Sequence, residues 1–128
     1  MKKIIAVVGA VIFNENNEVL CALRSPIMQL LNYWELPDGK VDKGETPQEA
    51  LVRENKEELG CLIKVQEKIQ EIEHEYEDII VHLVTYKAII VMGRPKILEH
   101  VDLKRVSVIG LKGLNWAPAD VPTVNKLY

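Results

Sequence analysis

The strongest structural signal in the chain is a helix whose beginning and end are both marked, between Thr46 and Gly60. Thr46 is a favourable N-cap, Pro47 suits the first helical position, and Glu49 completes a Thr-x-x-Glu capping box. Gly60 supplies the stop, because glycine adopts the left-handed conformation that closes many helices. Apolar residues within these limits offer contacts to a core: Ala50, Leu51 and Leu59. The sequence therefore predicts a long central helix packed against another layer.

Segments rich in β-branched residues predict strands before this helix. Residues 4–13 and 19–23 are separated by a polar, asparagine-rich turn, which predicts a hairpin. Residues 24–33 have no clear period and contain a proline, which indicates a loop. Residues 34–36 predict a brief extended piece, which is expected to stop at the Pro-Asp-Gly sequence 37–39.

The part of the chain after the helix is also dominated by predicted strands. Residues 61–73 and 79–92 are expected to be strands joined by a polar hairpin turn at 73–78, and a last short strand is expected at 105–111. Asp120-Val121-Pro122 is expected to begin a C-terminal helix that reaches at least Lys126. These elements predict a strand-rich α+β domain.

Composition agrees with one globular domain over residues 1–128. A hydrophobic fraction of 48% is enough to form a core, and a charged fraction of 27% is ordinary, so intrinsic disorder is not expected. A net charge of −3 argues against a protein that holds a nucleic acid polymer by bulk positive charge. A small anionic ligand needs only a local site and is compatible with this charge.

The first residues resemble a signal peptide, because Met1-Lys2-Lys3 precedes an apolar run. A polar turn follows that run, and no small-x-small cleavage pattern comes before it. No other apolar segment approaches the roughly 20 residues that span a bilayer. Cys21 and Cys61 do not make a disulfide framework and are interpreted as reduced core residues. We therefore expect a soluble, cytoplasmic protein without a membrane partner.

Three glutamates on the central helix admit two interpretations. Glu54, Glu57 and Glu58 are spaced so that they share one helical face, where like charges repel. The face is either a solvated acidic surface or a site at which a divalent cation cancels the repulsion, and carboxylate oxygens suit Mg²⁺ or Mn²⁺. The glycine-bearing loop 39–45 before the helix favours the second interpretation, because its backbone and Lys40 can face a phosphate or a metal.

Residues 39–61 read G-x5-E-x7-R-E-N-K-E-E-L-G-C and resemble the Nudix box, G-x5-E-x7-R-E-U-x-E-E-x-G-U, where U is apolar. The chain is also similar to the MutT-like nucleoside triphosphate pyrophosphohydrolases at 23–24 and 34–37, and its tail at 117–122 is similar to the cytidine triphosphate branch. The resemblance implies a Nudix fold, an α/β/α sandwich with a central mixed sheet between the two helices. All seven fixed positions of the box match: Gly39, Glu45, Arg53, Glu54, Glu57, Glu58 and Gly60.

The same resemblance implies Mg²⁺-dependent (or Mn²⁺-dependent) hydrolysis of a (deoxy)nucleoside triphosphate to the monophosphate and pyrophosphate. The expected substrates are cytidine nucleotides or oxidised purines such as 8-oxo-dGTP. Arg53 would orient the carboxylates, with Glu45 as a partner. Glu54 is the first candidate for the general base, and Glu99 is the second and a further metal ligand. The implied metal ligands are the Gly39 carbonyl and the side chains of Glu54, Glu57, Glu58 and Glu99.

The substrate itself is expected to contact four residues. Arg24 and Lys40 are the candidate phosphate contacts, and Glu35 belongs to the substrate-binding set that the resemblance implies. Asp120 is the candidate for base recognition, because a carboxylate accepts a hydrogen bond from an exocyclic amine, and it is equally suited to cap the C-terminal helix.

Other side chains with binding potential are given structural roles or none. Trp116 and Tyr33 could stack on a base, but a core position is favoured for both. The histidines lack the spacing of a metal site and are assigned no role: His74, His82 and His100.

Two positions depart from the pattern of the family. Asp38 stands where the MutT-like proteins usually have a second glycine, which raises the question of a left-handed backbone and adds a carboxylate near the cation. Asn55 stands at an apolar position, and we expect its amide to have a hydrogen-bond partner if it is buried.

Two alternatives stay open. The chain either acts on another nucleoside diphosphate derivative, such as ADP-ribose or a dinucleoside polyphosphate, or is a Nudix module that binds a nucleotide without cleaving it. In each case the partner is a small nucleotide, and the protein is a monomer or a homodimer.

Overall fold

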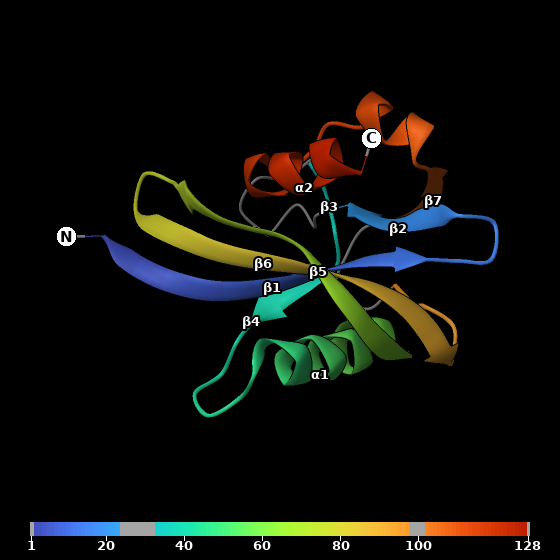
Figure 1. The fold of residues 1–128 in the computed structure, drawn as a ribbon, viewed down its shortest axis with the longest axis horizontal. Helices are drawn as coiled ribbons and strands as arrows, with labels where there is room; N and C mark the ends of the chain where they lie inside the picture. Colours follow the sequence, from blue (N-terminus) through green and yellow to red (C-terminus); the bar gives the residue numbers. More distant parts are fainter. Residues whose placement is uncertain (1, 24–32, 98–101, 128) are drawn as a thin grey trace.

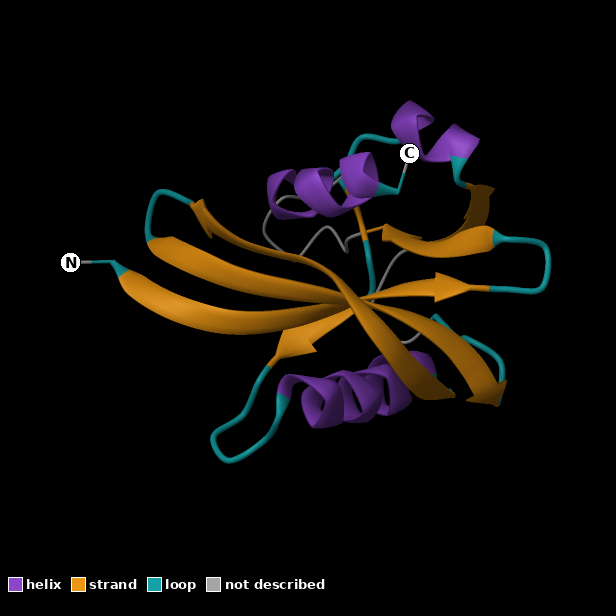
Figure 2. Ribbon diagram, in the orientation of Figure 1, coloured by secondary structure: helices purple, strands orange, loops and turns teal. Residues whose placement is uncertain are grey.

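A computed structural model of the chain describes residues 2–23, 33–97 and 102–127. A twisted sheet lies between two layers of helix (Figures 1 and 2). Helix α1 (Pro47–Leu59) covers one face, and α2 (Val121–Lys126) covers the other together with the short 3₁₀ helices Ile109–Gly113 and Pro118–Asp120. The expected α+β sandwich with a central sheet is confirmed.

The sheet is mixed and contains seven strands. The strands are β1 (Lys3–Phe13), β2 (Glu18–Leu23), β3 (Trp34–Glu35), β4 (Asp38–Lys40), β5 (Leu62–Glu75), β6 (Ile79–Met92) and β7 (Asp102–Ser107). The path of the sheet is β3-β2-β1-β6-β5, while β4 pairs with β1 and β7 pairs with β2. The β1–β6 pair is parallel, from Lys3 opposite Ile79 to Phe13 opposite Ile89, and the other pairs are antiparallel.

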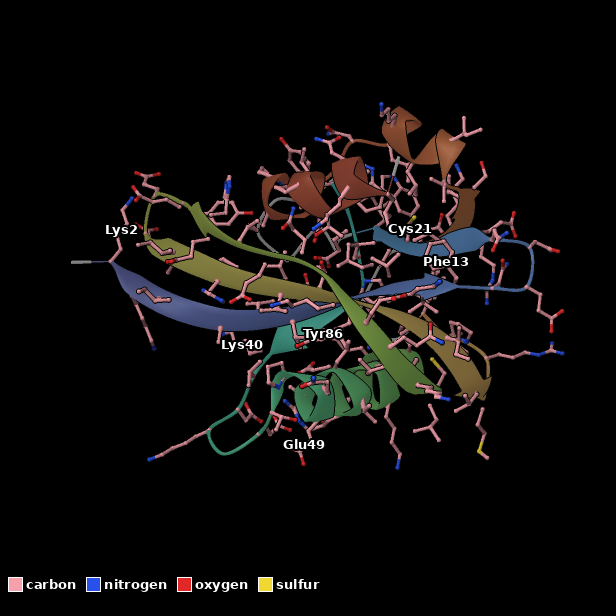
Figure 3. The ribbon with its side chains drawn as sticks, in the orientation of Figure 1. Lys2, Phe13, Cys21, Lys40, Glu49 and Tyr86 are labelled. Carbon is pink, nitrogen blue, oxygen red and sulfur yellow. The ribbon has the colours of Figure 1, made fainter. Side chains whose placement is uncertain are left out.

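Two apolar clusters join the sheet to its helices. Val8 and Ile12 of β1 pack with Leu51 and Leu59 on the α1 side, while a second cluster that includes Val11 lies on the other side. Residues 8–12 of β1 are therefore buried on both faces, as an interior strand requires. Figure 3 labels one member of each cluster, Tyr86 on the α1 side and Cys21 on the α2 side.

The caps predicted for the central helix are confirmed. The Thr46 hydroxyl accepts a hydrogen bond from the Glu49 backbone N–H at 3.1 Å, and the Glu49 carboxylate accepts one from the Thr46 N–H at 2.9 Å. Gly60 closes the helix with a φ of 70°. Caps of this kind each stabilise a helix by about 1 kcal/mol, so the start of α1 is well defined.

Three predicted boundaries were wrong. The predicted stop falls at Leu36 and Pro37 and does not extend to residue 39, because Asp38–Lys40 forms β4 by pairing with β1. Strand β5 continues to Glu75, since its cross-strand pairs with β6 extend to the end of the hairpin and leave a shorter turn than 73–78. The last strand is Asp102–Ser107, and the chain then enters the 3₁₀ helix Ile109–Gly113.

The N-terminal apolar run is strand β1 at the centre of the sheet. Cys21 and Cys61 are buried free thiols, as predicted. Burial raises the pKa of Cys21 to about 12 and also raises the pKa of Cys61. Among the helices in the described ranges, none combines the length and the apolar character needed to cross a bilayer.

Candidate active site

Arg53 organises the acidic face of α1. Its Nε and Nη2 atoms donate to the two carboxylate oxygens of Glu45 at 2.8 and 2.9 Å, which makes a bidentate pair. Its Nη1 donates to Glu54 at 2.9 Å and to Glu57 at 3.2 Å, and Nη2 also donates to the Lys40 carbonyl at 3.1 Å. The predicted pairing of Arg53 with Glu45 is confirmed. One guanidinium thus connects the helix to the loop and to the end of β4.

This pairing changes the acidity of both partners. The hydrogen bonds from Arg53 are the largest effect that lowers the pKa of Glu45, from 4.5 to about 2. The same hydrogen bonds are the largest effect that raises the pKa of Arg53. Both groups are therefore charged at neutral pH, and the loop before α1 is held by an ion pair.

Gly39 on β4 lies directly against the side chain of Glu54. A β-carbon built on Gly39 would lie 2.2 Å from both Cγ and Cδ of Glu54, far inside van der Waals contact. The Glu54 side chain is 15% exposed, so this contact is partly shielded from water. Only a glycine permits β4 to approach the first box glutamate so closely.

The acidic face fits a hard divalent cation by the chemistry of its donors. Glu57 is exposed, Glu58 and Glu54 are half-buried, and all three offer carboxylate oxygens. In the described part of the chain, no three His, Cys, Asp or Glu residues form a ready metal cluster. The guanidinium of Arg53 pairs with Glu54 and Glu57 in this structure and offsets part of their negative charge.

A cavity of about 240 Å³ lies beside β4. Apolar side chains of β1 and β6 form one part of its wall, including Val7, Val81 and Leu83. Its charged lining comes from Glu35, Asp38 and Lys40, which are close in sequence, and from Asp120, which is distant from them. Gly39 also lines this cavity, so the cavity and the acidic face of α1 meet at one residue.

Asp120 lies in the wall of the cavity and is 1% exposed. The backbone N–H of Leu36 donates to its carboxylate at 3.3 Å. Asp120 occupies the N-cap position of α2, but its side chain makes no capping hydrogen bond, so the capping interpretation was wrong. Backbone hydrogen bonds of 2.8 Å link Trp34 to Asn115 and to Ala117 and hold this segment beside β3.

The structure places some predicted site residues and not others. Glu35 is 1% exposed and lines the cavity, and Lys40 on β4, labelled in Figure 3, also lines it. Arg24 and Glu99 lie outside the described residues. Trp116 is buried and its indole N–H donates to the Leu111 carbonyl at 2.7 Å, which confirms the core position.

Tyr76 is a cavity residue that sequence reasoning missed. It lies in the turn between β5 and β6, and its hydroxyl accepts a hydrogen bond of 3.3 Å from the backbone N–H of Ala119. This contact joins the hairpin to the segment that carries Asp120. No motif marks Tyr76, because only the packing of the hairpin against the C-terminal segment brings it to the cavity.

The two departures from the family pattern are both resolved. Asp38 lies in the extended strand β4, and outside glycine the described residue with positive φ is Asn17, so no left-handed backbone is involved. The side chain of Asp38 lines the cavity, whereas it is Gly39 that contacts Glu54. Asn55 is 2% exposed, and its Nδ2 donates to the Leu51 carbonyl at 2.9 Å, which confirms a partner for the amide nitrogen, while Oδ1 has no partner among the described residues.

Comparisons with known proteins agree with this geometry. A profile of the NUDIX domain matches residues 3–121. The chain is 34% identical over 127 residues to an 8-oxo-dGTP diphosphatase of Escherichia coli, covering 99% of this chain and 98% of the relative. It is 33% identical over 120 residues to a CTP pyrophosphohydrolase of the same organism, covering 94% and 88%.

Two solved structures are similar to this chain over almost its whole length. A MutT protein described as a Nudix hydrolase, from methicillin-resistant Staphylococcus aureus 252, is 49% identical with a TM-score of 0.81, and 99% of this chain and 97% of that chain are covered. The E. coli ORF135 protein is 31% identical with a TM-score of 0.84, and 98% and 89% are covered.

Proposed function

Because the chain belongs to the NUDIX domain family and is a Nudix hydrolase, we propose that it cleaves (deoxy)nucleoside triphosphates to the monophosphate and pyrophosphate. The proposed substrates are 8-oxo-dGTP or a cytidine triphosphate. Relatives described as an 8-oxo-dGTP diphosphatase and as a CTP pyrophosphohydrolase support these two possibilities.

The observation that carries the proposal is the meeting of the cavity and the acidic face at Gly39. The cavity has an apolar wall and buried carboxylates, which suit a flat base with N–H groups. Lys40 lies beside Gly39 and offers a positive charge to a phosphate. In the proposed complex the base occupies the cavity, and the phosphates extend past Gly39 towards Glu54.

The proposed hydrolysis requires a divalent cation, Mg²⁺ or Mn²⁺. The Gly39 carbonyl and the three box glutamates would hold it, with Glu99 as a further ligand. When bound, such an ion neutralises phosphate oxygens and lowers the pKa of water. The glycine cradle and the all-oxygen donor set support this assignment.

The residues of the chain then have separate roles in hydrolysis. Glu54 accepts a proton from water as the water oxygen forms a bond to phosphorus. The P–O bond between the α- and β-phosphates breaks, and pyrophosphate and the monophosphate are released. Arg53 holds the Glu54 carboxylate through the 2.9 Å hydrogen bond, and Glu45 fixes Arg53 in turn. Lys40 and Arg24 bind phosphate oxygens, while Asp120 and Glu35 contact the nucleoside.

Product analysis tests this proposal. The purified protein is incubated with Mg²⁺ and a panel of the common NTPs and dNTPs, 5-methyl-dCTP, 8-oxo-dGTP and ADP-ribose. Monophosphate and pyrophosphate from a triphosphate are expected. AMP with ribose phosphate from ADP-ribose alone would assign the activity to another diphosphate derivative. Tight nucleotide binding without any cleavage would indicate a binding module.

A further inference from the structure

Consecutive residues of β4 face opposite sides of the sheet. Gly39 pairs with Val8 and faces α1, where Glu54 lies against it. Asp38 pairs with Gly9, and a β-carbon built on Gly9 would lie 3.8 Å from the Asp38 β-carbon and 3.6 Å from Leu83, a residue of the cavity wall. The Asp38 side chain therefore lines the cavity and lies on the opposite face of β4 from Glu54.

Asp38 gives the cavity a third carboxylate, besides those of Glu35 and Asp120. Ionised carboxylates only accept hydrogen bonds, so this wall is rich in acceptors. The two other carboxylates are almost completely buried, which makes their interaction with a ligand strong and leaves little water to compete. Such a wall disfavours phosphate and favours a group with N–H donors.

The nucleobases differ in the groups that they offer to an acceptor. Cytosine, adenine and guanine each carry an exocyclic amine, which is an N–H donor. Uracil and thymine have no exocyclic amine: they carry a carbonyl oxygen where cytosine carries its amine, and their N–H donor lies in the ring between two carbonyl oxygens. A carboxylate that faces the exocyclic group therefore attracts the amine and repels the carbonyl oxygen. An acceptor added to the wall therefore changes the relative affinity of the two groups of bases.

On the basis of the proposed function, we propose that Asp38 is a specificity-determining residue that favours nucleotides with an amine-bearing base over those of uracil and thymine. Asp38 is suited to this role because its side chain lines the cavity together with Val7 and Leu83 of the apolar wall, where a base would lie.

The experiment compares kcat and KM for dCTP and dTTP in the wild type, Asp38→Asn and Asp38→Gly. The amide of Asp38→Asn presents an N–H group where the carboxylate presented an acceptor, at nearly constant volume. We expect the ratio of kcat/KM for dCTP to that for dTTP to fall roughly 10- to 100-fold, mostly through KM for dCTP, as for the loss of a hydrogen bond to a charged group. Asp38→Gly should lower the ratio as well, without the added donor.

Glu15→Gln is the matched control, because it removes one negative charge from the exposed turn between β1 and β2. Its ratio should equal that of the wild type. An equal loss of activity on both nucleotides in Asp38→Asn, or an unchanged ratio in both Asp38 variants, would overturn the inference. A thermal unfolding curve for each variant separates these outcomes from loss of the fold.

Failure of the proposed function would be recognised separately. If the wild type cleaves no nucleotide, calorimetric titration with dCMP and dTMP still tests Asp38. Tighter binding of dCMP that is lost in Asp38→Asn would support the specificity role in a binding module. Equal binding of the two monophosphates by the wild type would contradict it.

Discussion

A single methyl group added at Gly39 should disable hydrolysis while leaving the fold almost unchanged. In Gly39→Ala the new β-carbon would lie 2.2 Å from Cγ and Cδ of Glu54, whereas ordinary van der Waals contact begins near 3.4 Å. The Glu54 carboxylate must therefore move by about 1 Å, and a displacement of that size costs roughly 100-fold in rate. We expect kcat for the best triphosphate to fall by about that factor.

The stability of Gly39→Ala should change much less than its activity. The atoms in the way belong to the end of a flexible glutamate side chain, which can turn aside, and we expect a loss of about 1 kcal/mol in the free energy of unfolding. Steady-state pyrophosphate release and thermal unfolding measure the two effects. Gly113→Ala is the matched control, because a β-carbon there meets no atom within 4 Å. Wild-type kcat in Gly39→Ala would refute the role given to the contact between β4 and Glu54.

Three further predictions concern other parts of the molecule. Asp120→Ala should raise KM by about 10-fold with little change in kcat, because it removes an acceptor from the base cavity; an unchanged KM for every base would remove Asp120 from that role. The lowered pKa of Glu45 means that its pairing with Arg53 stabilises the fold above pH 4.5 and is lost as the pH falls towards 2. The stability difference between the wild type and Glu45→Gln in urea unfolding should therefore shrink over that range, and a constant difference would contradict this. Cys21 and Cys61 should react with a thiol reagent only after denaturation, since both are buried and have raised pKa values. Rapid labelling of the native protein would show that these thiols are accessible to the reagent and would contradict the prediction.

Local signals in the sequence were enough for the best-defined parts of the molecule. The capping box at Thr46 and the glycine at 60 determine α1 through contacts between residues only a few positions apart. The caps depend on short-range chemistry that a sequence displays directly. The pairing of Arg53 with Glu45 was implied instead by the resemblance of residues 39–61 to the Nudix box, and the structure contains it.

Features that depend on long-range pairing could not be obtained in this way. Residues 37–39 have the composition of a turn, and only pairing with the neighbouring strand β1 makes Asp38 and Gly39 part of the sheet. The register of that pairing also decides which face Asp38 occupies, so its side chain could not be assigned from the sequence. Tyr76 reaches the cavity through the packing of a hairpin on the C-terminal segment, for which the sequence offers no periodic signal.

The central claim is that Glu54 on the acidic face of α1 drives the release of pyrophosphate. Measurement of pyrophosphate release by Glu54→Gln beside the wild type, with thermal unfolding of both, tests it most directly. The predicted result is a loss of kcat of about 10²- to 10⁴-fold with an unchanged unfolding temperature, because the amide keeps the shape of the side chain but accepts no proton. Substantial turnover by a folded Glu54→Gln protein would contradict both roles given to Glu54, as a general base and as a metal ligand.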